Sequence, residues 1–259
     1  TLTTQETTNP IGVIMRKSLS LLAVTTGLSL NATQVLAEEA RTYTREEIEK
    51  IVVETIIKNP EAIIESMELM QDRAQKEKEA KAKANLQAYR TSLYEDEHSP
   101  RVGNKKPKVT VVEFFDYNCG YCKRSLDAVQ QLIDVNDDIQ VIFKEVAMLA
   151  PSSADAAKAA LAMYKLNPDR YFDFHAALFS MNGRFDDKNL AGVAEGMGVD
   201  PDTFLKMKNS PEIKKQLDDN MSLAQKMEVT GIPVFIIGDQ LFPGAIPYDV
   251  MQEEIDLQK

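Results

Sequence analysis

The chain contains two cysteines, Cys119 and Cys122, with two residues between them and an apolar segment before them. This spacing places two thiols one turn apart at the start of a helix, where both can join one disulfide. In a first helical turn, unpaired backbone N–H groups and the helix dipole favour a thiolate, so we expect Cys119 to be the nucleophile. Cys122 is then placed to attack a mixed disulfide on Cys119 and resolve it.

Two structural roles compete with thiol chemistry for this pair. A zinc site needs four ligands, and the two histidines, His98 and His175, lie far from the pair and outside zinc-finger spacing. A purely structural disulfide between Cys119 and Cys122 would close too short a loop to remove much entropy from the unfolded chain. The sequence therefore favours a redox-active disulfide, and we expect neither a metal nor a cofactor.

The segments around the cysteines alternate between strand and helix patterns. Apolar, β-branched runs indicate strands, the spacing after Cys122 is helical, and a long stretch after the second strand carries helical segments without a convincing strand. This order predicts an α/β thioredoxin fold interrupted by a helical insertion. The expected elements are strands over 109–115, 139–145 and 232–237, a turn at 238–239 before a short strand over 240–242, helices over 125–135 and 247–257, and the insertion over about 150–226.

The N-terminal region reads as a targeting segment. Met15-Arg-Lys is positively charged, residues 19–30 form a short apolar run, and Val35-Leu36-Ala37 is a small-residue cleavage pattern. We therefore assign residues 1–37 to upstream residues and a signal peptide cleaved after Ala37. An exported chain with one cysteine pair belongs where disulfides persist, so we expect the bacterial periplasm.

Residues 38–95 are expected to form a helical N-terminal segment that joins protomers. Thr44 and Glu47 fit a capping box, and Asn59 is expected to cap a second helix that begins at Pro60. The apolar stripes of these helices must be covered, either by the chain's own catalytic domain or by self-association, which we favour. A turn-rich stretch then marks a boundary near Glu95, before a catalytic domain over 96–259. The stripes consist of Ile48, Ile51, Val52, Ile56, Ile63, Met67, Met70 and Ala74.

The acidic composition argues against one class of binding partner, the nucleic acids. The 259 residues carry a net charge of -10, whereas neutralising nucleic-acid phosphates needs a basic face. We therefore expect no nucleic-acid partner.

The residues from Glu113 to Lys123, with Phe143-Lys144-Glu145 and Gly231-Ile232-Pro233, resemble the exported DsbA-like thiol:disulfide oxidoreductases. The resemblance spans roughly Tyr43 to the C-terminus. Its N-terminal helices are similar to the oligomeric branch that includes the suppressor of copper sensitivity protein C. The resemblance implies exported cysteine-containing client proteins and a membrane redox partner, either a DsbB-like oxidase or a DsbD-like reductase.

The same resemblance implies roles for individual residues. Pro233 is expected to be a cis-proline against the cysteine pair, leaving backbone groups of Ile232 to bind an extended substrate. Glu113 is expected to move a proton during exchange, with a pKa raised by burial, and Lys144 is expected either to pair with it or to be solvated.

The residues that distinguish oxidases from isomerases give mixed signals. Gly120 and Tyr121 between the cysteines resemble the DsbC-type isomerases, whereas Ile232 resembles the valine of the oxidase. Both residues of the Gly-Tyr pair are expected to contact substrate.

An alternative function is a periplasmic holdase or a copper(I) binder. The long helices, the eleven methionines and the two soft thiolate ligands motivate it. Methionines at helical spacing are usually core residues, which makes copper the weaker of the two readings.

Overall fold

The computed structural model describes residues 42–182 and 184–259. Their contacts divide the chain into two compact units, one ending at Asn59 and one spanning Pro60–Lys259. The boundary near Glu95 stays a prediction, and the expected signal peptide with its cleavage after Ala37 lies outside the described residues. No helix in the described part of the chain is both long enough and apolar enough to cross a membrane.

The described part of the first unit, residues 42–59, forms one helix, α1 (Arg45–Lys58). The expected capping box is present, because the Thr44 hydroxyl accepts the Glu47 N–H at 3.2 Å and the Glu47 carboxylate accepts the Thr44 N–H at 2.9 Å. The expectation that Asn59 caps the next helix is wrong. Its side-chain amide donates to the carbonyl of Thr55 at 2.7 Å, so it closes the C-terminal end of α1.

The second unit starts with α2 (Glu61–Ala88) and the short α3 (Arg90–Tyr94). The N-terminal part of α2 has no buried residue, whereas Leu86 near its C-terminal end is buried. Leu93 of α3 is fully buried in the same cluster. The C-terminal end of α2 and α3 therefore pack on the domain that follows.

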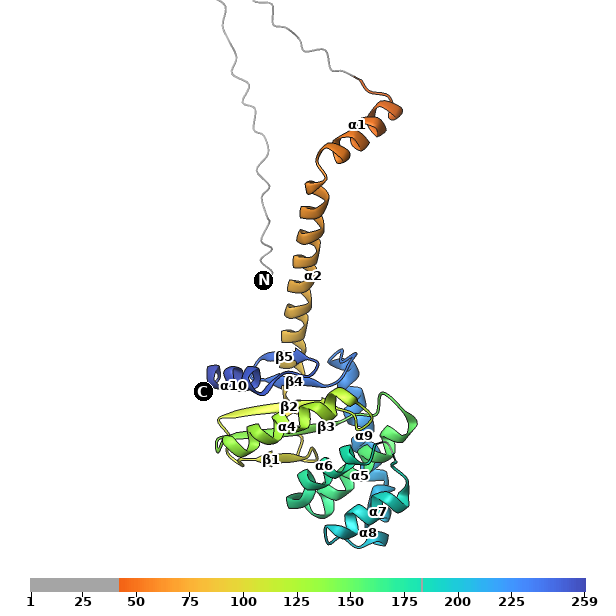
Figure 1. Cartoon of the computed structure of the whole chain (residues 1–259), viewed down its shortest axis with the longest axis vertical. Coiled ribbons are helices and arrows are strands. Elements are labelled where there is room, and N and C mark those ends of the chain that lie inside the picture. Colours follow the sequence, from red (N-terminus) through yellow and green to blue (C-terminus); the bar gives the residue numbers. More distant parts are fainter. Residues whose placement is uncertain (1–41, 183) are drawn as a thin grey trace, which may run out of the picture. The chain divides into compact units, whose positions relative to one another are not determined.

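A five-stranded mixed sheet lies at the centre of the second unit, in the order β1-β3-β2-β4-β5 (Figure 1). Strands β2 and β3 pair in parallel, and every other pair is antiparallel. The turn-rich stretch after Glu95 contains the three-residue β1, which is too short to leave a sequence pattern. The strands are β1 (Arg101–Gly103), β2 (Val109–Phe115), β3 (Ile139–Glu145), β4 (Val234–Ile237) and β5 (Gln240–Pro243).

Helices cover the sheet and fill the long connection between β3 and β4. Helix α4 follows β2, five helices lie between β3 and β4, and α10 closes the chain. The fold is thus the expected thioredoxin fold with a helical insertion. The remaining helices are α4 (Gly120–Val135), α5 (Pro151–Leu166), α6 (Tyr171–Ser180), α7 (Asp187–Gly196), α8 (Pro201–Lys208), α9 (Pro211–Lys226) and α10 (Tyr248–Leu257), with a 3-10 turn at Pro168–Arg170.

The two faces of the sheet carry separate cores, because successive strand residues point in opposite directions. On β2, Val111 and Phe115 pack in the larger cluster with both cysteines and with α5 and α6. Val112 and Phe114 pack on the other face, in the cluster that holds Leu86, α3 and part of α9. Alternation places Glu113 in the row of Val111 and Phe115, on the face that carries the cysteines.

Candidate active site

The loop between β2 and α4 is held in place by a buried carboxylate. Asp116 is fully buried, and its oxygens accept the N–H groups of Asn118 at 2.8 Å, Met148 at 2.8 Å and Leu149 at 3.1 Å. Its backbone carbonyl accepts the N–H of Cys119 at 2.9 Å. Asp116 thereby joins the loop that carries Cys119 to the loop that follows β3.

Cys119 is the N-cap of α4, as its spacing predicts. Its sulfur accepts the backbone N–H of Cys122 at 3.3 Å, one of the donors that a helix start leaves without an intrahelical partner. Both thiols are free. Cys119 is 5% exposed and Cys122 only 1%, and burial, with a hydrogen bond to Cys119, raises the pKa of the Cys122 thiol well above its ordinary value. The second thiol is the more enclosed one.

The segment before β4 lies against Cys119. The peptide bond between Ile232 and Pro233 is cis, as the family resemblance implies. The Cys119 thiol donates to the carbonyl oxygen of Ile232 at 3.5 Å, a sulfur contact between segments far apart in the sequence. The Pro233 carbonyl accepts the N–H of Gly244 at 2.8 Å, which connects this segment to the loop after β5.

Glu113 is buried behind the pair. Only 3% of the residue is exposed, and burial raises its pKa from 4.5 to about 8. The raised pKa keeps most of Glu113 neutral at pH 7 while leaving its proton available near that pH.

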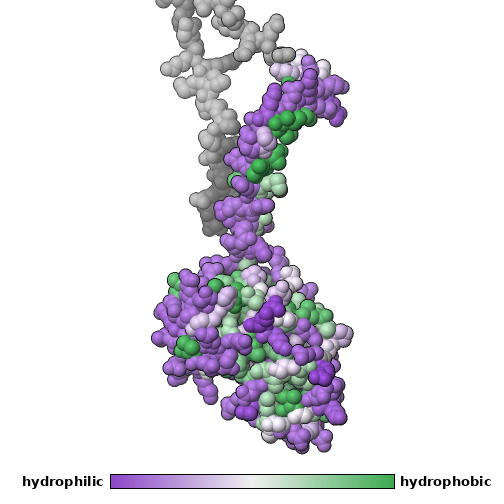
Figure 2. All heavy atoms as spheres, viewed as in Figure 1, coloured by the Kyte–Doolittle hydropathy of each residue, from purple (hydrophilic) through white to green (hydrophobic). Residues whose placement is uncertain are grey.

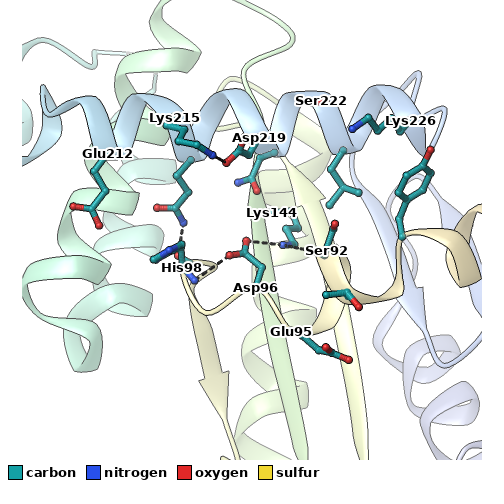
Figure 3. A pocket seen from close by; sticks show the side chains of 15 residues that line it. Ser92, Glu95, Asp96, His98, Lys144, Glu212, Lys215, Asp219, Ser222 and Lys226 are labelled. Atoms are coloured by element: carbon teal, nitrogen blue, oxygen red, sulfur yellow. Dashed lines mark hydrogen bonds and ion pairs between the residues drawn. The ribbon is translucent and has the colours of Figure 1, made fainter.

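Lys144 does not pair with Glu113, and it is not solvated either. Adjacent strand residues point to opposite faces, so Lys144 lies on the face away from the cysteines, under a pocket of about 520 Å³ between α3 and α9 (Figure 3). Its ammonium donates to Asp96 at 3.1 Å, to the Ser92 carbonyl at 2.7 Å and to Ser99 at 2.7 Å. Burial lowers the pKa of Lys144, while Asp96 acts in the opposite direction.

The two residues between the cysteines form the exposed start of α4. Gly120 is exposed, and Tyr121 is 62% exposed. The guanidinium of Arg124 lies over that ring, 4.1 Å from its centroid. Tyr121 and Arg124 thus form an aromatic and cationic surface next to Cys119.

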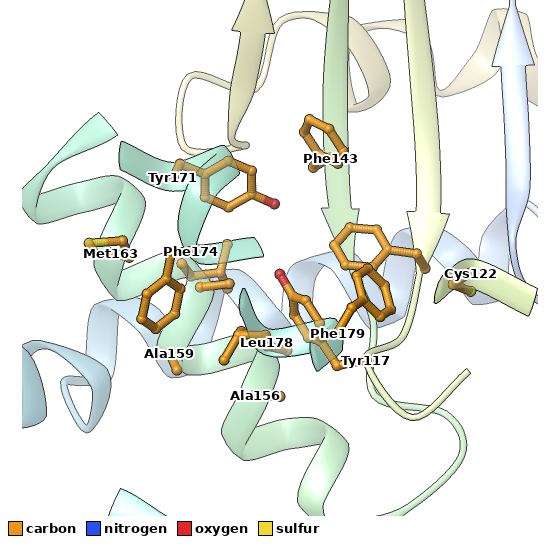
Figure 4. Close-up of a cluster of buried hydrophobic side chains, with 14 of the residues drawn as sticks. Tyr117, Cys122, Phe143, Ala156, Ala159, Met163, Tyr171, Phe174, Leu178 and Phe179 are labelled. Carbon is orange, nitrogen blue, oxygen red and sulfur yellow. The ribbon is translucent and has the colours of Figure 1, made fainter. Parts of the chain in front are cut away.

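A buried polar cluster behind the loop was not predicted from the sequence. The Tyr171 hydroxyl lies 2.7 Å from Glu145 Oε1, and the Tyr117 hydroxyl lies 3.3 Å from the same oxygen and 2.9 Å from His175 Nδ1. Figure 4 shows Tyr117 and Tyr171 within the aromatic core beside Phe143. Burial raises the pKa of Glu145 well above its ordinary value and lowers that of His175 to about 3.

These buried residues left only weak signals in the sequence. Asp116 and Asn118 have the spacing of a turn in which an aspartate accepts the N–H two residues on, a pattern that could have been recognised. Glu145 stands between Lys144 and Val146 at the end of an apolar strand, and nothing local reveals its partners on α6. Among the described residues, no group of three or more His, Cys, Asp and Glu side chains could hold a metal ion.

Comparison with known proteins agrees with this geometry. Residues 110–256 match the family model of the DSBA-like thioredoxin domain. The chain is 26% identical over 170 residues to disulfide bond formation protein D of Bacillus subtilis (strain 168). This match covers 61% of this chain and 75% of that protein.

Solved structures with the same fold extend the similarity. The thiol-disulfide exchange protein alpha-DsbA2 of Wolbachia pipientis is 33% identical, with a TM-score of 0.66, and the match covers 70% of this chain and 97% of that one. ScsC of Proteus mirabilis in a transitional conformation is 29% identical, with a TM-score of 0.62, over 82% of this chain and 95% of that one.

Proposed function

The chain belongs to the DSBA-like thioredoxin domain family of thiol:disulfide oxidoreductases, and we propose that it exchanges disulfides with exported, cysteine-containing proteins through Cys119 and Cys122. The observation that carries the proposal is the position of the Cys119 sulfur. It lies at the start of α4, within 3.3 Å of the Cys122 N–H, and it is the less buried of the two thiols. At this position the sulfur accepts a backbone N–H of the first helical turn, as expected for the attacking cysteine.

The exchange requires two sulfur displacements. In reduction, the Cys119 thiolate attacks a client disulfide, forms a mixed disulfide and expels one client thiolate. Cys122 then loses its proton and attacks the Cys119 sulfur, which releases the second client thiolate and leaves a Cys119–Cys122 disulfide. Oxidation of a client dithiol follows the same steps in reverse.

Glu113 moves the proton that this exchange requires. The Cys122 thiol is buried, so it needs a proton acceptor when it becomes the attacking thiolate, and the thiolate needs a proton donor when it leaves. Glu113 lies on the same face of the sheet and has a pKa near 8, which lets it act in both directions close to neutral pH.

Clients and redox partners approach at the exposed surface around Cys119. Tyr121 projects from the first turn of α4, and the Ile232 backbone lies beside the sulfur, where it can pair with an extended client segment. We propose that this chemistry takes place in the periplasm, because the sequence predicts a signal peptide. There the pair is kept oxidised or reduced by a membrane partner of the DsbB or DsbD type.

The exposed apolar stripes of the N-terminal helices support self-association. Figure 2 shows apolar atoms on α1 and on the N-terminal half of α2. These side chains are exposed in the single chain, and a second copy would remove them from water. An assembly with more than one Cys119 can hold a client while its disulfides rearrange, so we propose an isomerase activity in addition to oxidation. The side chains are Ile48, Ile51, Val52, Ile56, Ile63 and Met67.

Substitution of Cys119 by serine tests the proposed activity. Serine is a good N-cap residue, so Cys119→Ser keeps the start of α4 and removes only the sulfur. We expect this variant to lose reduction of insulin disulfides and refolding of a scrambled disulfide protein. Full activity in the variant would refute the proposal, and protection of a client from aggregation without disulfide exchange in the wild type would favour a holdase.

A further inference from the structure

A groove separates the C-terminal half of α2 from the segment that contains Ile232. Its volume is about 680 Å³. One wall is α2 between Gln75 and Leu86, and the other is formed by residues 227–232 with parts of β4 and β5. Strand β5 is an edge strand of the sheet, because it pairs with β4 alone.

Two ion pairs and a buried leucine hold the walls together. Lys81 on α2 pairs with Glu228 at 2.6 Å, and Lys83 pairs with Asp239 in the turn between β4 and β5 at 3.0 Å. Leu86 packs in the same cluster as Val229 and Val234. This part of α2 therefore packs on the domain through Leu86, with the two ion pairs at the surface of the contact.

The floor of the groove is apolar. Leu86, Met227, Val229 and Val234 line it and are each less than 9% exposed, and the half-buried Leu241 of β5 lies beside them. The charges of Lys83 and Asp239 at the rim neutralise each other. The α2 wall is mostly polar, with Lys76, Lys78 and Glu79 among its residues, so the apolar contacts of the groove come from its floor. A ligand that packs on this floor carries apolar side chains.

One residue that lines the groove contacts the reacting sulfur. Ile232 lines the groove, and its carbonyl oxygen is the group that lies 3.5 Å from Cys119 Sγ. Among the hydrogen bonds of the described residues, none uses the backbone N–H of Gly231 or Ile232. A client chain joined to Cys119 by a disulfide would therefore meet free backbone groups where the groove begins.

The length of the groove fits an extended peptide. The eleven steps from Gln75 to Leu86 span about 16 Å along a helix at 1.5 Å per residue. An extended chain rises about 3.3 Å per residue, so about five residues occupy the same length.

We propose that this groove binds an extended, apolar segment of the client, next to the cysteine that reacts with Cys119. The proposal rests on the proposed disulfide exchange and specifies which clients react fastest. Helix α2 then has a role in substrate selection, since it supplies one wall.

Two probes of different size separate the groove from the thiol chemistry. The first is glutathione disulfide, which is too short to fill the groove. The second is an apolar peptide of about ten residues, longer than the groove, whose central cysteine is disulfide-bonded to glutathione. Reduced full-length protein attacks either disulfide, the probe leaves as thiols, and the protein becomes the Cys119–Cys122 disulfide. Acid quenching and mass spectrometry give the rate.

Two tryptophan variants on α2 form a matched pair, one on the face of the helix that lines the groove and one on its exposed face. Ala82 is half-buried and lines the groove, whereas Ala84 is exposed on the same helix and does not line it. We expect Ala82→Trp to slow oxidation by the apolar peptide about tenfold, equivalent to about 1.4 kcal/mol, and to leave the rate with glutathione disulfide unchanged. Ala84→Trp should change neither rate. Leu241→Gln, which keeps the space but removes apolar surface, should slow only the peptide.

Several results would overturn the proposal that the groove binds the client. Wild-type peptide rates in both Ala82→Trp and Leu241→Gln would overturn it, as would an equal slowing of both probes. A peptide of the same length with charged residues in place of the apolar ones should react more slowly with the wild type, and equal rates would also overturn it. Failure of wild-type protein to react with glutathione disulfide would instead overturn the proposed disulfide exchange.

Discussion

The sulfur of Cys119 lies 3.5 Å from the carbonyl oxygen of Ile232, although 113 positions separate the two residues in the sequence. The contact brings the nucleophile on α4 against the segment that precedes β4. A client attached to Cys119 therefore lies beside the Ile232 backbone. The mechanism depends on this juxtaposition and on the different surroundings of the two thiols.

The two thiols should react with an alkylating agent at different rates. Cys119 accepts a helix N–H, whereas burial raises the pKa of Cys122. At neutral pH we expect iodoacetamide to modify Cys119 at least about tenfold faster than Cys122 in the reduced protein. Mass spectrometry of peptides from quenched samples measures both rates, and equal rates would contradict the assignment of the nucleophile.

Glu113 should make the protein less stable as the pH rises. Its pKa is raised from 4.5 to about 8 by burial, so between these pH values the folded state holds a proton that the unfolded state has lost. The free energy of unfolding should therefore fall across this range, and the buried Glu145 acts in the same direction.

Replacement of Glu113 isolates its part of this pH dependence. Urea unfolding of reduced Glu113→Gln between pH 5 and pH 9 should show a shallower fall than the wild type, by a few kcal/mol over the whole range. The matched control is Glu195→Gln, which changes an exposed carboxylate on α7. If Glu113→Gln and the wild type lose stability in parallel, the buried carboxyl does not titrate as described.

The ion pair under the opposite face should affect stability and leave the thiols unchanged. Asp96→Asn removes the carboxylate that faces the fully buried Lys144. We expect a loss of about 3 kcal/mol in the free energy of unfolding, because the ammonium stays buried without the negative charge that balances it. Asp72→Asn, which breaks the exposed pair with Lys76, should cost little. A changed alkylation rate at Cys119 in Asp96→Asn would show that the two faces are coupled.

Self-association should depend on the apolar stripe of α1. The double variant Ile51→Glu and Ile56→Glu places charges in that stripe, and we expect light scattering to find a monomer. Lys50→Glu changes the charge on the opposite side of the same helix and should leave the assembly intact. The monomer should keep oxidase activity and lose isomerase activity. A monomeric wild type, or a double variant that remains assembled, would contradict the proposed interface.

Local sequence patterns were sufficient to predict the order of strands and helices and several of the positions where they begin or end. The two-residue spacing of the cysteines predicts that Cys119 lies at the start of a helix, and it is the N-cap of α4. Gly238, which has a positive φ, turns the chain between β4 and β5 as the Gly-Asp pair predicts. The family resemblance supplied the cis bond at Pro233, which no local pattern specifies.

The errors concern interactions between distant segments. Whether Lys144 can reach Glu113 depends on the register between β2 and β3, which pairs Glu113 with Phe143 and sends Lys144 to the opposite face. Asn59 stands between two helices, and sequence alone does not decide which one its side chain caps. The contacts of Glu145 with Tyr117 and Tyr171 form only when the helical insertion packs on the sheet.

Trapping of the mixed disulfide tests the central claim most directly. In a Cys122→Ser variant, Cys119 can attack a client disulfide but no resolving thiol remains, so the covalent adduct should accumulate. We predict that mass spectrometry will find an unfolded client attached to Cys119 in Cys122→Ser, and no adduct in Cys119→Ser under the same conditions. An adduct on Cys122 in Cys119→Ser, or no adduct in Cys122→Ser, would contradict the assignment of Cys119 as the nucleophile and Cys122 as the resolving thiol.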